Sequence, residues 1–365
     1  MRPAVKYTLL TLLWGAVGAY VYWAAHAAKS GRSTRTVERL EIDIVDSTSQ
    51  GHLVSSAEVR KWLAAEGIEP VGKAAKEVDL TAIERLIARN GFVERAAAYI
   101  TRNGELHIDI RQRKPLLRLL TGDENSYVTA SGFVFAAPRA SSRYVPVVTG
   151  SYRPPFPSGY TGDVWACMEA ENRRIEAEIA ALEAEKLPVH REERDDYRSW
   201  LEARRTSVKW WWKYLDDDAE YAARLDRLRT EKQRLHREYR YRAHLRQQRL
   251  DRIEARQEEK RREQKKLTKN YEDFLKLLTF VRSVEADDFW SAEIVQIVAR
   301  TSPSGALEID LIPRSGEHRI RFGRLERTDE KLDKSLRFYR KGLSRIGWER
   351  CRVVDVRYRD QVVCR

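Results

Sequence analysis

The feature that most constrains this chain is an apolar run near its start, from Thr8 to Ala28. As a helix rising about 1.5 Å per residue, the run is long enough to cross a hydrocarbon core of about 30 Å. Tyr20 and Trp23 suit the membrane–water interface, where an aromatic ring can keep one edge hydrated. The sequence therefore predicts a single transmembrane helix over residues 8–28.

A cleaved export signal is the alternative, since Ala25-His26-Ala27 has the small residues of a cleavage site. The apolar core of such a signal is usually about 7 to 15 residues, so this longer run favours a retained anchor. Basic residues flank the run on both sides, at Arg2 and Lys6 and at Lys29 and Arg32. Charge therefore does not predict the orientation in the membrane.

Beyond the anchor, the chain is long enough for two or three domains of usual size. The net charge is +13, and residues 229–269 contain 16 Lys and Arg against 7 Asp and Glu. Most of the positive charge is therefore in one segment. Its basic residues occur on all sides of the expected helix with few aromatic residues between them, a pattern that disfavours a nucleic-acid site.

The three cysteines, Cys167, Cys351 and Cys364, form no CxxC motif and no cluster with histidine, so the sequence supports no metal site. A straight hairpin turning at residues 359–360 would place Cys364 opposite Asp355, four residues from Cys351. That separation is about 13 Å, whereas the alpha carbons of a disulfide lie within about 7 Å. We therefore predict free thiols.

Residues 37–113 show the order strand, helix, helix, strand, strand. Ser55-Ser56 can cap the first helix, and Asp79 or Thr81 can cap the second. A turn at Asn103-Gly104 predicts the closing hairpin. Such a unit buries one sheet face under two helices and leaves a strand edge free for a partner.

Strand-like segments continue over residues 114–150, and a linker rich in Pro and Tyr follows them. The chain is helical in character to about Leu278 and then strand-like again to its end. Because each strand-like region is incomplete by itself, we predict one β-rich domain made of residues 114–150 and 271–365. Residues 151–270 would then be a linker and a helical insertion, which a surface loop tolerates.

The insertion predicts a helical hairpin of coiled-coil type, broken at Pro188 and turning near Asp216-Asp217-Asp218. Trp210, Trp211 and Trp212 lie close to this turn. Successive helical side chains are about 100° apart, so the three rings cannot share one face. We predict that this tip contacts a membrane interface or a partner; alternatively, Trp211 and Trp212 clamp the two helices.

In their order, these features resemble the FtsQ/DivIB family of bacterial cell-division proteins, over everything except the insertion. Gln112 departs from the family pattern, which usually has Glu at this position. The resemblance rests on the N-terminal span and on residues 79–111, Arg113-Lys114-Pro115, residues 128–132, residues 145–150, residues 354–358, Val362 and Val363.

The resemblance implies an α+β chain with a polypeptide-transport-associated (POTRA) domain at 37–113 and a β domain. Residues 1–7 would be cytoplasmic, 29–36 a linker, and the remainder periplasmic at the bacterial inner membrane. It further implies a noncatalytic scaffold at the division septum, without cofactor, metal or small-molecule substrate. Its implied partners are FtsB-like and FtsL-like small coiled-coil proteins and, through them, the proteins of septal wall synthesis.

Members of the family bind a partner by strand addition to the last strands, after an Asp-x-Arg-Tyr motif. The guanidinium of Arg357 would also donate two hydrogen bonds to a carboxylate of the partner. The alternative is that Arg357 and Tyr358 only pack over the face of the sheet and bind no partner. Carried over, the candidate docking residues are Arg357, Tyr358, Gln361, Val362, Val363 and Cys364.

The sequence contains no nucleotide-binding loop, nucleophile elbow or zinc-protease motif, and its histidines are scattered. Enzymatic function therefore has little support. Two other functions remain as alternatives: an exported coiled-coil scaffold unrelated to division, and a membrane-tethered nucleic-acid-binding protein that uses the basic segment.

Overall fold

The computed structural model describes residues 13–24, 36–45, 53–122, 124–137, 143–343, 345, 347 and 350–365. Of the predicted span 8–28, residues 13–24 are helical, and the rest lies outside the described residues. None of the helices described is both long and apolar enough to cross a membrane. The chain divides into two compact units, one from the ranges 1–153, 157–163 and 276–365 and one from 154–156 and 164–275.

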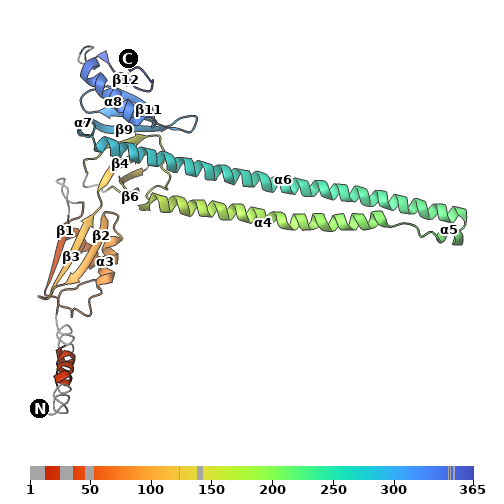
Figure 1. Ribbon diagram of the computed structural model, residues 1–365, viewed down its shortest axis with the longest axis horizontal. Helices are drawn as coiled ribbons and strands as arrows, with labels where there is room; N and C mark the ends of the chain where they lie inside the picture. The colour runs from red at the N-terminus through yellow and green to blue at the C-terminus, as the bar shows by residue number, and fades with distance from the viewer. Residues whose placement is uncertain are drawn as a thin grey trace, which may run out of the picture. The chain divides into compact units, whose positions relative to one another are not determined.

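The first unit begins with a small sheet of three strands packed against two helices (Figure 1). The strand order is β1-β3-β2, with β1 parallel and β2 antiparallel to the central β3. The predicted order of strands and helices is confirmed. The elements are β1 (Arg39–Val45), α2 (Ser56–Ala65), α3 (Leu80–Ala88), β2 (Val93–Ile100) and β3 (Glu105–Gln112).

Both helices begin at side chains that satisfy the free amides of a first turn. The Ser55 hydroxyl accepts from the Glu58 amide at 3.3 Å, and the Glu58 carboxylate accepts from the Ser55 amide at 2.8 Å. This reciprocal pair is a capping box. At α3 the cap is Asp79 rather than Thr81, because an Asp79 carboxylate oxygen accepts from the Ala82 amide at 2.9 Å.

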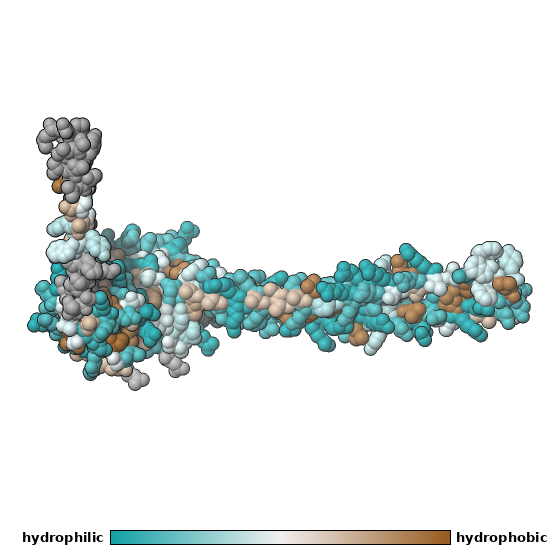
Figure 2. All heavy atoms as spheres, turned by 90° about the horizontal axis from the view of Figure 1, so that it is seen from below, coloured by the Kyte–Doolittle hydropathy of each residue, from teal (hydrophilic) through white to brown (hydrophobic). Residues whose placement is uncertain are grey.

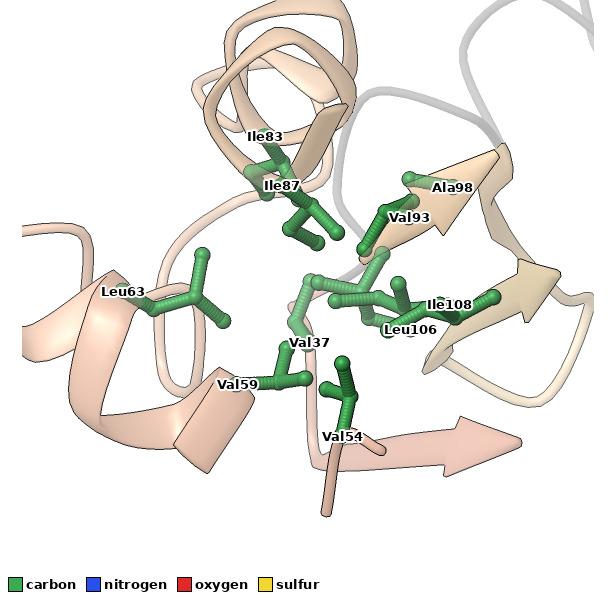
Figure 3. Packing of buried hydrophobic residues seen from close by; sticks show 11 residues of the cluster. Val37, Val54, Val59, Leu63, Ile83, Ile87, Val93, Ala98, Leu106 and Ile108 are labelled. Carbon is green, nitrogen blue, oxygen red and sulfur yellow. The ribbon is translucent and has the colours of Figure 1, made fainter. Parts of the chain in front are cut away.

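The core of this module is apolar, and its side chains point toward one another from both helices and the sheet (Figure 3). Alternation along β3 turns every second side chain inward. Full burial of a Leu or Ile side chain stabilises the fold by about 1.5 to 3 kcal/mol. The fully buried members include Val59, Leu63, Ile83, Ile87, Leu106, Ile108 and Ile110.

A second sheet, of ten strands among the described residues, combines strands from both sides of the helical segment. Its order is β13-β12-β11-β10-β9-β7-β4-β5-β6-β8, and β7 pairs in parallel with β9 to join the two sets. The strands are β4 (Pro115–Thr121), β5 (Glu124–Thr129), β6 (Phe133–Ala136), β7 (Val147–Gly150), β8 (Gly162–Asp163), β9 (Ile294–Thr301), β10 (Leu307–Pro313), β11 (Arg319–Arg324), β12 (Val353–Asp355) and β13 (Val363–Cys364).

Helical segments pack with this sheet inside the first unit. The end of α6 (Asp218–Glu285) buries Phe280, whose ring lies 5.0 Å from that of Phe322 on β11. The short α7 (Asp288–Glu293) leads into β9. Between β11 and β12, α8 (Thr328–Phe338) continues as one π-helical turn, η1 (Tyr339–Leu343).

The second unit is a helical hairpin of α4 (Val164–Arg205), α5 (Trp212–Leu215) and most of α6, in which α4 and α6 lie side by side (Figure 1). The expected break at Pro188 is wrong, since α4 is continuous through it. Proline removes one backbone hydrogen bond of the helix. Leu182 and Val189, on either side of Pro188, are buried in the hairpin, and this burial compensates for that loss.

Polar contacts run along the seam between α4 and α6. Residue numbers fall in one helix as they rise in the other, so the pairing is antiparallel and has one register. Figure 2 shows the hairpin surface as largely hydrophilic with separate hydrophobic patches. The polar seam pairs are Gln264 with Asn172, Lys260 with Glu178, Gln257 with Glu183 and Arg246 with Asp196.

Candidate functional site

The predicted docking strand forms an open edge of the ten-stranded sheet. β13 pairs with β12 on one side, with Val354 opposite Cys364 and Asp355 opposite Val363. In the strand order of the described residues, β13 is the last strand and has no neighbour on its other side. An edge of this kind presents unpaired backbone groups to which another strand can bind.

The hydrogen-bond pattern identifies which backbone groups face outward. Val353 and Arg365 exchange two backbone hydrogen bonds, of 2.8 and 3.0 Å. In an antiparallel pair, residues bonded in this way alternate with residues whose N–H and C=O groups point away from the partner strand. Cys364 is one of the latter, and the same alternation assigns Val362 to the outward side.

Arg357 is held within the ribbon by Asp355. Its Nε and one Nη donate to the two oxygens of Asp355 at 2.9 and 2.7 Å. Burial acts to raise the pKa of Asp355, but the hydrogen bonds from Arg357 outweigh burial and lower it. Gly323, at φ +73°, leaves room for the Arg357 stem, because a Cβ there would lie 2.8 Å from Arg357 Cδ. The Asp-x-Arg motif thus forms an internal bidentate ion pair.

The turn between β12 and β13 is tethered to α8. The ammonium of Lys334 donates to the carbonyl of Tyr358 and, at 3.2 Å, to that of Arg359. Tyr358 and Gln361 are exposed, whereas Val362, Val363 and Cys364 are half-buried. The structure therefore brings all six predicted docking residues together on one ribbon, with the polar ones at its turn.

Cys351 and Cys364 form a disulfide, with alpha carbons 5.4 Å apart, so the prediction of free thiols is wrong for this pair. The prediction treated residues 351–358 as one straight strand. In the structure Cys364 lies opposite Val354 rather than Asp355, one residue closer to Cys351. β12 also begins only at Val353, and a bend at residue 352 separates Cys351 from it, so the two alpha carbons come within reach of a disulfide. Cys167 is free, as predicted.

The three adjacent tryptophans of the hairpin separate into two environments. The Trp212 ring lies 3.9 Å from the guanidinium of Arg224, which also pairs with Asp216 at 2.5 Å. Trp210 is 71% exposed, and its ring contacts those of Trp211 and the exposed Tyr214 edge to face. The exposed rings thus form a small aromatic cluster at the turn of the hairpin.

Sequence spacing missed a polar cluster on the open face of the three-stranded sheet. Strand register places Glu41 and Tyr99 on either side of His107, and Glu105 lies two residues before His107. Ligand atoms of Glu41, Glu105 and His107 lie within 4.8 Å of one another. We do not assign a metal site to this cluster, because carboxylates around a histidine at a protein surface also form ordinary ion pairs.

Gln112, the departure from the family pattern, has a structural role of its own. Its buried carbonyl oxygen accepts from the Leu53 amide at 2.7 Å, and its NH₂ donates to the Val54 carbonyl at 3.3 Å. A carboxylate could satisfy only the first of these groups. The amide therefore fits this position better than the acid would.

Comparison with known families gives two matches, in the order that the fold requires. Residues 35–111 match a POTRA-like domain, which is the module of β1, α2, α3, β2 and β3. Residues 260–365 match the family described as FtsQ/DivIB, C-terminal related, and this range includes the open edge at β13. No curated protein matches the chain. A POTRA-like module ahead of a sheet that carries the Asp-x-Arg-Tyr ribbon supports the resemblance of this chain to the FtsQ/DivIB family.

Proposed function

We propose that this chain is a noncatalytic scaffold of the cell-division machinery that binds a partner protein by strand addition at β13. The single observation that carries the proposal is the position of β13 as an open edge within the matched C-terminal range. Outward N–H and C=O groups at Val362 and Cys364 would pair with an extended partner segment. The proposed partners are an FtsB-like and an FtsL-like protein, linked in turn to septal wall synthesis.

We propose residues 8–28 as the membrane anchor in the inner membrane, with residues 37–365 in the periplasm. The Cys351–Cys364 disulfide supports this orientation, because disulfides persist in oxidising compartments and are rare in the cytosol. The proposed domains are the POTRA module at 37–113 and a β domain at 114–150 and 271–365. The insertion at 151–270 would then be a periplasmic coiled-coil arm.

Docking through β13 is tested by removing one outward backbone donor. Val362→Pro deletes the outward amide, and we expect it to weaken capture of the purified FtsB-like protein by about tenfold or more. Val362→Ala is the matched control, since it shortens the same side chain and keeps the amide. Equal capture by both variants would contradict docking at this edge.

Division itself is tested in cells. A fluorescent fusion of the full chain is expected at midcell during septation, and the Val362→Pro variant is expected to recruit less of the FtsB-like protein there. A diffuse envelope distribution of the wild-type fusion would instead favour an exported scaffold unrelated to division. A cytoplasmic result from a topology reporter fused after residue 365 would contradict the proposed orientation.

We also propose that the aromatic cluster at the hairpin turn contacts a lipid interface. Tyr214 and Leu215 are 78% and 71% exposed beside Trp210, and Lys209 and Lys213 flank these rings. Aromatic rings next to basic side chains suit the headgroup region of an anionic bilayer. The cluster therefore combines the two features that attract a helix turn to such a surface.

Cosedimentation of the full chain with phosphatidylglycerol vesicles tests this contact. Binding should fall when Trp210 and Trp211 are both changed to Ala, because the exposed rings of the cluster are then lost. Trp212→Ala is the control, since it removes a tryptophan of the same run whose ring is held by Arg224. Unchanged cosedimentation of the double variant would remove the proposal.

A further inference from the structure

The docking strand is short, so its position in the sheet needs support. β13 contains two residues, and among the described parts of the chain it pairs on one side only. Short edge segments with few buried contacts open locally at little cost in free energy. Lys334 holds the turn at residues 358–359 but does not hold the far end of the strand.

The disulfide supplies a covalent link at that far end. It joins Cys364 within β13 to Cys351, which is 1% exposed and lies just ahead of β12. The link spans 13 residues and so restricts the conformations that a released strand can adopt. Cys351 is not one of the six docking residues. An effect of changing Cys351 on docking would therefore come from the disulfide and not from a lost contact with the partner.

We propose that Cys351 and Cys364 are positioning residues for the docking edge: their disulfide holds β13 in the sheet before a partner arrives, and its reduction releases the strand. This inference rests on the proposed function. Reduction by a dithiol breaks the S–S bond and forms two thiols, while the dithiol is oxidised to a disulfide and supplies two electrons and two protons. Glutathione disulfide reverses the change.

The first test is local hydrogen exchange in the full chain, with and without dithiothreitol. We expect reduction to accelerate exchange of the Val363 and Arg365 amides by about tenfold or more and to leave the β10 amides unchanged. The Cys351→Ser variant should behave as the reduced chain does, and Cys167→Ser should behave as the wild type. Retained protection at residues 363–365 after reduction would overturn the inference.

The second test measures capture of the purified FtsB-like protein across a series of glutathione redox buffers. If the released strand is docked in about one tenth of molecules, the apparent Kd should rise about tenfold on reduction. Binding should change at the same potential as the Cys351–Cys364 pair and should recover on reoxidation. The β10 amides should keep their protection throughout, which a general loss of stability would not allow.

The outcomes separate the two proposals. Equal capture by the oxidised and reduced chains would overturn the positioning role and leave strand addition intact. No capture by the oxidised chain, with β13 protected in the exchange experiment, would instead overturn the proposed function and the docking role of the disulfide with it.

Discussion

The POTRA-like module and the helical hairpin are stabilised in opposite ways. The module buries a continuous apolar cluster that includes Ile87, Leu106 and Ile108. The hairpin seam mixes a few buried apolar residues with the pairs Arg246–Asp196 and Gln257–Glu183. Burial of apolar side chains contributes much stability but permits more than one alignment of the packed elements. Polar pairs in the seam contribute little stability, but they are satisfied in only one alignment of the two helices. The difference indicates that the module is built for stability and the hairpin for a defined geometry.

The largest expected effect is at the apolar core. Ile108→Ala should lower the unfolding free energy of the module by about 2 to 5 kcal/mol, because it removes buried methyl groups and leaves a cavity. Hydrogen exchange of the β3 and α3 amides in the full chain measures this loss. The control is Val71→Ala in the same module, where the side chain is 53% exposed and a change within about 0.5 kcal/mol is expected. If Ile108→Ala lowered the unfolding free energy as little as Val71→Ala does, the apolar core would not be the main source of the module's stability, and the contrast with the hairpin would fail.

A smaller loss is expected at the charged seam. Arg246→Ala removes the buried partner of Asp196, whose carboxylate keeps its pair with the exposed Arg242 at 3.0 Å. The change should destabilise the hairpin by about 1 to 2 kcal/mol, measured by exchange of the α4 amides. Replacing both Arg246 and Asp196 by Leu should restore most of this stability, because the charge that loses a partner, Arg242, is exposed and also pairs with Glu238. Arg256→Ala is the control, since its pair with Glu185 is exposed and worth at most about 0.5 kcal/mol.

The buried amide of Gln112, within the apolar module, sharpens the comparison. Gln112→Glu should cost about 1 to 2 kcal/mol, because the Val54 carbonyl loses its donor while the Leu53 amide keeps its acceptor. Gln112→Leu removes both partners and should cost more. Exchange of the amides of residues 53–65 provides the measurement. A Glu variant as stable as the wild type would mean that the amide has no advantage here.

The smallest expected effect is on pH dependence. The hydrogen bond from Gln257 lowers the pKa of Glu183, and the hydrogen bond from Lys260 lowers that of Glu178, below the ordinary value of 4.5. A carboxyl group with a depressed folded pKa stabilises the fold above its unfolded pKa and loses that contribution as pH falls through the folded value. Helix melting followed by circular dichroism should therefore shift to lower temperature below about pH 4.5. Gln257→Leu should reduce the shift.

Several expectations from the sequence agree with the structure because they depend on local rules. Alternation over residues 37–45 and the turn at Asn103-Gly104 predicted strands, and Ser55 and Asp79 predicted helix starts. Two expectations failed where distant residues intervene. Packing of α4 against α6 carries the helix through Pro188, and a bend ahead of β12 brings Cys351 to Cys364.

The candidate site was predictable in position but not in its contacts. The six docking residues were named from the sequence through the family resemblance, and they lie together on one ribbon. The pairing of Val353 with Arg365 determines which backbone groups face outward. The guanidinium of Arg357 is already hydrogen-bonded to the Asp355 carboxylate. Register and side-chain partners of this kind are not visible in residue spacing.

The sequence by itself determined the element types and their order, because period-2 and period-3.6 patterns, caps and turns act over a few residues. Only the tertiary structure decided the disulfide, the continuity of α4, the amide contacts of Gln112 and the open edge at β13. Each of these depends on which distant segments come to lie side by side. That choice is made by the total free energy of packing and pairing, to which local propensity contributes only a small part.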